Sequence, residues 1–61
     1  MGQRDGVGVE IYSGGKMIME VFRDDTKMKR EVTLYQKELE LDVVEQAIAI
    51  FKKEIPHDYQ D

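Results

Sequence analysis

Apolar and polar residues alternate along the first half of the chain, and this pattern predicts three β-strands. Alternation covers residues 7–12 and 30–36, and residues 16–23 between them form a predicted strand with apolar side chains on both faces. Ser13-Gly14-Gly15 predicts a hairpin turn between the first two stretches, because glycine adopts positive φ angles without a steric penalty. Residues 24–29 are polar and predict the second turn. We therefore expect a three-stranded antiparallel sheet over residues 7–36.

The side chains that face one another predict the register of the first hairpin. A two-residue turn at Gly14-Gly15 would set Val9 against Glu20, which places a carboxylate beside a valine at a considerable cost unless it is paired. A three-residue loop at residues 13–15 gives apolar pairs instead: Ile11 with Met17, Val9 with Met19 and Val7 with Val21. We expect the three-residue loop. If Val21 then faces Val32 and Met19 faces Leu34, the predicted core face consists of Val7, Val9, Ile11, Met17, Met19, Val21, Val32 and Leu34.

Apolar residues recur at helical spacing in the last third of the chain. One stripe consists of Val44, Ala47, Ile48, Phe51 and Ile55. Asp42 followed by Glu45 matches a capping box, which predicts that the helix begins at Asp42. Pro56 predicts that the helix ends at about Ile55, because proline lacks an amide hydrogen. The predicted helix covers residues 42–55.

These elements predict a single domain over residues 1–61. Residues 1–6 carry little apolar surface and are expected to form a flexible arm, and residues 56–61 a short polar tail. The predicted fold class is α+β, a three-stranded antiparallel β-meander with one C-terminal α-helix packed on one face (β-β-β-α).

One helix covers only one face of such a sheet, and the predicted outer face is unusually apolar. It carries Tyr12, Ile18, Phe22 and Tyr35. Large exposed apolar patches often mark interaction sites, and aromatic residues suit interfaces because they bury much area for little lost rotamer freedom. We predict that these four residues form the interface of a homodimer. Pairing of open edge strands is the alternative dimer geometry.

The size and composition of the chain also favour association. A chain of 61 residues buries only about 60% of the surface that it exposes when unfolded, so the domain is marginally stable. Small domains gain stability from disulfides, metals or oligomers, and the absence of cysteine excludes disulfides. That absence also fits a cytoplasmic location. No segment approaches the length of an apolar membrane span, so we expect no membrane association.

The chain offers few residues for catalysis or for cofactors. It has no cysteine, and its single histidine, His57, lies in the polar tail, so a nucleophile and a base are hard to place together. Asp24-Asp25 lacks the spaced ligands and the glycine of a calcium loop. Gly14-Gly15-Lys16 lacks the frame of a phosphate-binding loop. We therefore predict a protein without enzymatic activity, cofactor or metal.

Nucleic-acid binding is the alternative function that the predicted fold raises. A three-stranded sheet followed by one helix resembles the arrangement of AP2-type and integrase arm-binding domains, whose sheet enters a DNA groove. The resemblance is one of topology over residues 7–55 and has no sequence motif. The second turn would then supply candidate phosphate contacts from Arg23, Lys27, Lys29 and Arg30.

Charge argues against nucleic acid as the partner. The net charge is −4, and the predicted outer face carries Glu10, Glu20 and Glu31. The acid is concentrated in residues 38–61, where seven acidic residues outnumber two basic ones, which leaves nucleic-acid mimicry as a further alternative. We predict a small non-enzymatic protein–protein interaction or regulatory module that acts as a homodimer and has another protein as its target.

Overall fold

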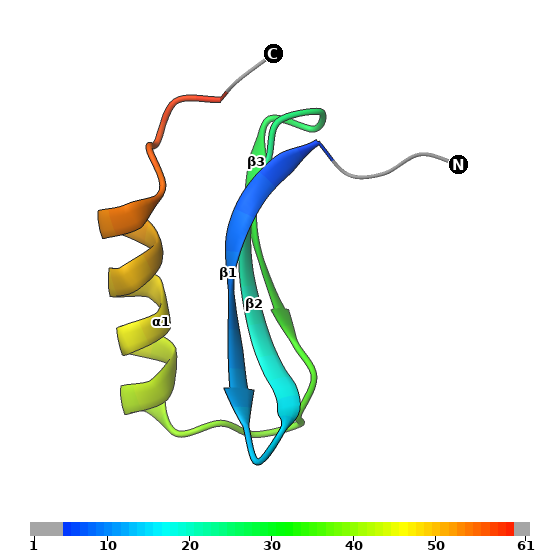
Figure 1. Cartoon of the computed structure of the whole chain (residues 1–61), viewed down its shortest axis with the longest axis vertical. Coiled ribbons are helices and arrows are strands. Elements are labelled where there is room, and N and C mark those ends of the chain that lie inside the picture. The colour runs from blue at the N-terminus through cyan, green and yellow to red at the C-terminus, as the bar shows by residue number, and fades with distance from the viewer. Residues whose placement is uncertain (1–4, 60–61) are drawn as a thin grey trace.

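Three strands and one helix make up the fold in a computed structural model that describes residues 5–59. β1 (Gly6–Ser13), β2 (Lys16–Asp24) and β3 (Lys29–Leu34) form one open antiparallel sheet in the order β1-β2-β3. α1 (Leu41–Glu54) packs on one face of this sheet (Figure 1). The predicted α+β fold class is confirmed.

The N-terminal end of the described chain is hydrogen-bonded to the rest of the fold. The expected arm falls partly on residues 1–4, and the expected tail partly on residues 60–61, which lie outside the described residues. Gly6 already belongs to β1, and the Asp25 N–H donates to the Asp5 carbonyl at 2.7 Å. The first strand therefore begins one residue earlier than predicted.

The β1–β2 hairpin closes on Gly14-Gly15, so the predicted three-residue loop is wrong. Ser13 pairs with Lys16, and the two glycines have φ angles of 59° and 82°, as a two-residue type I′ turn requires. Val9 nevertheless pairs with Val21 and not with Glu20, because the register shifts between Ile11 and Tyr12. The observed pairs differ from the predicted ones by two residues, an even shift that leaves most side chains on their predicted faces.

This irregularity is a β-bulge in β2, and it moves two residues between environments. Tyr12 pairs with Met17 and Ile11 with Met19, so Ile18 is the extra residue. Ile18 was predicted on the outer face but is buried in the core, which also contains Met19, Val21, Ala47 and Phe51. Met17 was predicted in the core but is only half-buried and lies outside this cluster. A residue inserted into one strand interrupts the alternation on which both predictions depended.

The second strand pair has the predicted register. Met19 pairs with Leu34 and Val21 with Val32. The turn before β3 is held by Asp24, whose Oδ1 accepts hydrogen bonds from the Thr26 and Lys27 N–H groups, both at 3.0 Å. Such side-chain acceptance from the backbone is typical of aspartate at the start of a turn.

Helix α1 begins before the predicted capping box. Its N-cap residue is Glu40, which makes no side-chain capping hydrogen bond, and Asp42 lies within the first turn. The predicted role of Asp42 as the cap is therefore wrong, although its charge still complements the helix dipole. The helix ends before Pro56 as predicted, and the Ile55 N–H donates to the Phe51 carbonyl at 2.9 Å.

The helix lies over only part of the sheet. Within residues 5–59, α1 packs against β1 and β2 and makes no close backbone contact with β3 (Figure 1). Val32 and Leu34 were predicted in the core but are 49% and 53% exposed. Val7 is also exposed, in β1 at the opposite edge of the sheet. The core is thus centred on β2 and leaves the helix side of β3 uncovered.

Candidate functional site

The four residues of the predicted interface do not form one exposed patch. Tyr12 and Tyr35 are more than half exposed, whereas Ile18 and Phe22 are 6% and 8% exposed within a single chain. Ile18 is buried because the bulge brings it into the core. Two of the four residues are therefore covered within a single chain, and only Tyr12 and Tyr35 of the predicted interface are exposed.

Phe22 is covered by its own sheet, through two glycines in β1. Gly8 pairs directly with Phe22. A Cβ atom placed on Gly8 would lie 2.9 Å from Phe22 Cδ1, and one placed on Gly6 would lie 3.0 Å from Phe22 Cε2 and Cζ. The backbone carbonyls of Arg23 and Val21, together with the Phe22 ring, therefore occupy the space that side chains at these two positions would fill. Glycine at alternate positions of a strand opposite an aromatic residue is the sequence signal for this arrangement.

The rest of the outer face is polar and acidic. Glu10 pairs with Glu20 across β1 and β2, and Glu20 is buried by its neighbours. The Tyr12 hydroxyl donates to Glu10 Oε1 at 3.0 Å. This hydrogen bond, followed by the charge of Glu10, raises the pKa of Tyr12 above its ordinary value. A face with these carboxylates repels the phosphates of a nucleic acid.

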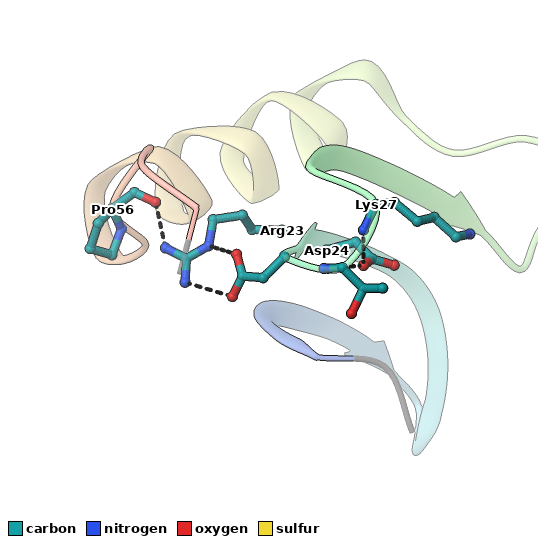
Figure 2. Close-up of polar contacts among 6 residues, drawn as sticks. Arg23, Asp24, Lys27 and Pro56 are labelled. Atoms are coloured by element: carbon teal, nitrogen blue, oxygen red, sulfur yellow. Dashed lines mark hydrogen bonds and ion pairs between the residues drawn. The ribbon is translucent and has the colours of Figure 1, made fainter. Parts of the chain in front are cut away.

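Arg23, one of the predicted phosphate contacts, is buried and holds the fold together. Its Nε lies 2.9 Å from Asp25 Oδ1, and its Nη2 lies 3.3 Å from Asp25 Oδ2. Figure 2 shows the same guanidinium reaching the segment after α1, where Nη1 donates to the Pro56 carbonyl at 2.7 Å. Arg23 therefore joins the β2–β3 turn to the helix end and is not available to a ligand.

The remaining basic residues of the turn do not converge. Lys27 lies 3.8 Å from Glu31 in an exposed ion pair. Lys29 and Arg30 are exposed and adjacent in β3, so their side chains point to opposite faces of the sheet. The four cations therefore do not all face the same way, and Arg23 among them is buried.

An open groove lies between α1 and β3, on the face of the sheet that carries the helix but beside the strand that the helix does not cover. It has a volume of about 510 Å³ and is lined by Val21, Met28, Lys29, Arg30, Glu31, Val32, Ile48, Phe51, Lys52 and Tyr59. A second hollow, of about 640 Å³, lies beside Leu34 and the start of α1. We refer to the exposed side chains of Val32 and Leu34, together with the groove between α1 and β3, as the β3 surface.

The backbone of β3 adds an open edge to the β3 surface. The Tyr35 N–H donates to the Ile18 carbonyl at 3.0 Å, so Tyr35 directs its backbone groups toward β2. Alternate residues of an antiparallel strand point their backbone groups to opposite sides. Arg30, Val32 and Leu34 therefore direct N–H and C=O groups away from β2. The sequence did not reveal this surface, because the helical stripe does not specify which strands the helix covers.

The described residues provide little that resembles a catalytic or metal site. Within residues 5–59, no group of three or more histidine, cysteine, aspartate or glutamate side chains is arranged to hold a metal ion. His57 is exposed, and its ring centroid lies 6.5 Å from that of Tyr59. In the same part of the chain, no helix is both long and apolar enough to cross a membrane.

Comparisons with protein-family models, with curated proteins and with solved structures find no match to this chain.

Proposed function

We propose that this chain is a small, non-enzymatic protein-interaction or regulatory module that acts as a homodimer and binds a protein partner in the cytoplasm. The observation that supports this proposal most directly is the β3 surface. Val32 and Leu34 point to the helix side of the sheet, yet each has about half of its surface in contact with solvent.

Apolar side chains in this position favour a protein partner over other ligands. Burying them removes apolar area from water, which stabilises a complex by about 25 cal/mol for each Å². The groove beside them is open, with Met28 and Ile48 among its lining residues. Methionine adapts its shape to a partner surface at little cost. The small domain also gains stability from any chain that covers this side.

Nucleic-acid binding has weaker support. Arg23 is engaged with Asp25 and Pro56, and Lys27 forms an ion pair with Glu31. The acidic outer face and the net charge of −4 oppose phosphate.

Sedimentation equilibrium of the full chain, at micromolar concentrations in low and high salt, tests the homodimer. We expect a species of twice the 7.1 kDa chain mass, with a dissociation constant that changes little with salt because the contact is apolar. A species of the single-chain mass at all concentrations would contradict the homodimer. Steep, log-linear weakening of binding to random-sequence DNA as salt rises would favour the nucleic-acid alternative instead.

A protein target is tested with immobilised protein and a nuclease-treated extract of the native host. Leu34→Lys and Ile50→Lys carry the same substitution at residues that are both exposed, one on the β3 surface and the other on α1. We expect a partner that Ile50→Lys retains and Leu34→Lys loses. Equal capture by both variants would show that target binding depends neither on the β3 surface nor on a dimer formed through it.

A further inference from the structure

We infer that two copies of the chain pair through their β3 strands, antiparallel, with Val32 of each copy beside the two-fold axis. This inference rests on the proposed homodimer and specifies its contact. The two three-stranded sheets then form one continuous six-stranded sheet, and both helices lie on the same side of it.

The open edge of β3 supplies the backbone groups for this pairing. Arg30, Val32 and Leu34 direct their N–H and C=O groups away from β2, as the hydrogen bond from Tyr35 to Ile18 requires. In an antiparallel pair, the residues that direct their backbone N–H and C=O groups toward the partner strand must lie opposite one another. Two copies of β3 meet this condition only when even-numbered residues face even-numbered residues. One residue then lies opposite its own copy at the two-fold axis.

Strand length and charge choose among the registers that remain. A pairing centred on Glu31 would place two carboxylates directly opposite each other, which is unfavourable. A pairing centred on Thr33 would use only residues 32–34, because β3 ends at Leu34. A pairing centred on Val32 uses residues 30–34 and sets Glu31 opposite Thr33 of the second copy. No like charges then lie directly opposite each other, and all three residues that direct their backbone groups outward, Arg30, Val32 and Leu34, take part in the ladder.

This register also covers the exposed apolar residues. Val32 and Leu34 lie on the helix side of the sheet and are exposed because α1 does not reach them. At the two-fold axis, the Val32 side chains of both copies become cross-strand neighbours, and Leu34 of each copy lies along the stem of Arg30 of the other. Cross-strand apolar pairs are the main source of stability in such sheets. Arginine stems cover apolar surface while the charged group stays in water.

The other edge of the sheet is less suited to the same role. The β1 residues Gly8, Glu10 and Tyr12 alternate with those that bond to β2, and none of them is aliphatic. The helix-side residues Val9 and Ile11 are already packed against the core. Pairing through β1 would therefore leave the apolar side chains of β3 in water. A second copy of β3 matches the β3 edge over residues 30–34.

Single-cysteine variants test the register, because the natural chain has no cysteine. Under mild oxidation, we expect Val32→Cys to form a disulfide-linked dimer rapidly, since Cα atoms in a hydrogen-bonded antiparallel pair lie about 5.5 Å apart, within disulfide range. Leu34→Cys should not link to itself, because four residues of strand, about 13 Å, then separate the two copies. A mixture of Arg30→Cys and Leu34→Cys should link as a heterodimer.

Charge at the two-fold axis provides a second test that does not depend on thiol chemistry. We expect Val32→Lys to raise the dimer dissociation constant by more than about tenfold, because like charges then face each other across the axis. The control Ile50→Lys, exposed on the helix, should leave it unchanged. Circular dichroism verifies that both variants fold.

The outcomes separate this inference from the homodimer itself. A dimer in which Glu31→Cys, Thr33→Cys or Leu34→Cys links to itself faster than Val32→Cys would overturn the register and leave the homodimer intact. A dimer whose dissociation constant is the same for Val32→Lys and the wild type would overturn the β3 contact. A chain that sediments as a monomer would overturn both proposals.

Discussion

Individual residues show how the outer face of this sheet avoids an exposed aromatic ring. Phe22 lies over the positions of Gly6 and Gly8, so the two glycines serve packing as much as backbone freedom. We expect Gly8→Ala to lower the free energy of unfolding by about 1–3 kcal/mol, as overpacking does, because the new methyl group meets Phe22 and the Val21 carbonyl. Urea unfolding followed by circular dichroism measures the change.

The control for this substitution is Gly14→Asn in the hairpin turn. Gly14 has a φ angle of 59°, and a Cβ atom there meets no other atom within 4 Å. Asparagine tolerates this left-handed conformation, so we expect a change within about 0.5 kcal/mol. Equal destabilisation by both variants would contradict the close packing of Gly8 against the Val21 carbonyl and Phe22.

The buried guanidinium of Arg23 makes three polar contacts, two with Asp25 and one with Pro56. Arg23→Lys retains the charge but cannot reproduce this planar fork. We expect it to lower the free energy of unfolding by about 1–3 kcal/mol, because buried acceptors lose their donors. Arg30→Lys, the same change at an exposed residue, should alter it by less than about 0.5 kcal/mol. Urea unfolding compares the two variants, and similar losses would contradict the account of Arg23.

The raised pKa of Tyr12 gives a pH-dependent prediction. The hydrogen bond to Glu10 favours the neutral phenol, so its stabilising effect is complete below the ordinary pKa of 10.0 and is lost as the pH rises through the raised value. We expect Glu10→Gln to lower the pKa of Tyr12 toward 10.0, measured by the NMR shift of the Tyr12 ring carbon. Glu31→Gln should leave it unchanged. A Tyr12 pKa that does not respond to Glu10→Gln would show that another group causes the shift.

At the scale of elements, sequence reasoning predicted the strands and the helix closely but not the detail of their connections. The argument against a valine facing Glu20 was sound, since Val9 does pair with Val21. The chain avoids pairing a valine with Glu20 through a β-bulge at Ile18. The alternation pattern does not predict this bulge, because it assumes a regular strand. The interface prediction failed for Ile18 for the same reason.

The start of α1 offers a site for stabilisation. Glu40 is the N-cap residue, with φ −63° and ψ 140°, but its side chain makes no capping hydrogen bond. Aspartate is shorter and among the best N-cap residues, so we expect Glu40→Asp to raise the free energy of unfolding by about 0.5–1 kcal/mol. Glu38→Asp, outside the helix, should have no effect. Thermal or urea unfolding measures both, and no gain from Glu40→Asp would indicate that water already satisfies the first turn.

At the scale of the whole molecule, the main departure from the predicted fold is the position of α1 over β1 and β2. A stripe of apolar residues indicates that a helix covers a sheet, but it does not indicate which strands of the sheet lie under the helix. For this reason the sequence predicted Val32 and Leu34 in the core and an interface on the opposite face. The alternative geometry of edge-strand pairing is the one that the exposed residues of β3 favour.

Dimerisation would make thermal stability depend on concentration. We expect the Tm of the wild type to rise by a few degrees for each tenfold increase in protein, because association stabilises the folded state by mass action. Differential scanning calorimetry at several concentrations measures this rise. Val32→Lys should have a Tm that depends less on concentration, whereas Ile50→Lys should behave as the wild type does. A wild-type Tm that does not vary with concentration would argue against association.

The end of β2 and the turn that follows it anchor both described ends of the chain: the Asp25 N–H donates to the Asp5 carbonyl, and the Arg23 guanidinium donates to the Pro56 carbonyl. Figure 1 shows both ends at the same pole of the molecule, with the Gly14-Gly15 hairpin at the opposite pole. A short flexible linker between the ends, with new termini opened at this exposed hairpin, would give a circular permutant that keeps every strand pair and the helix.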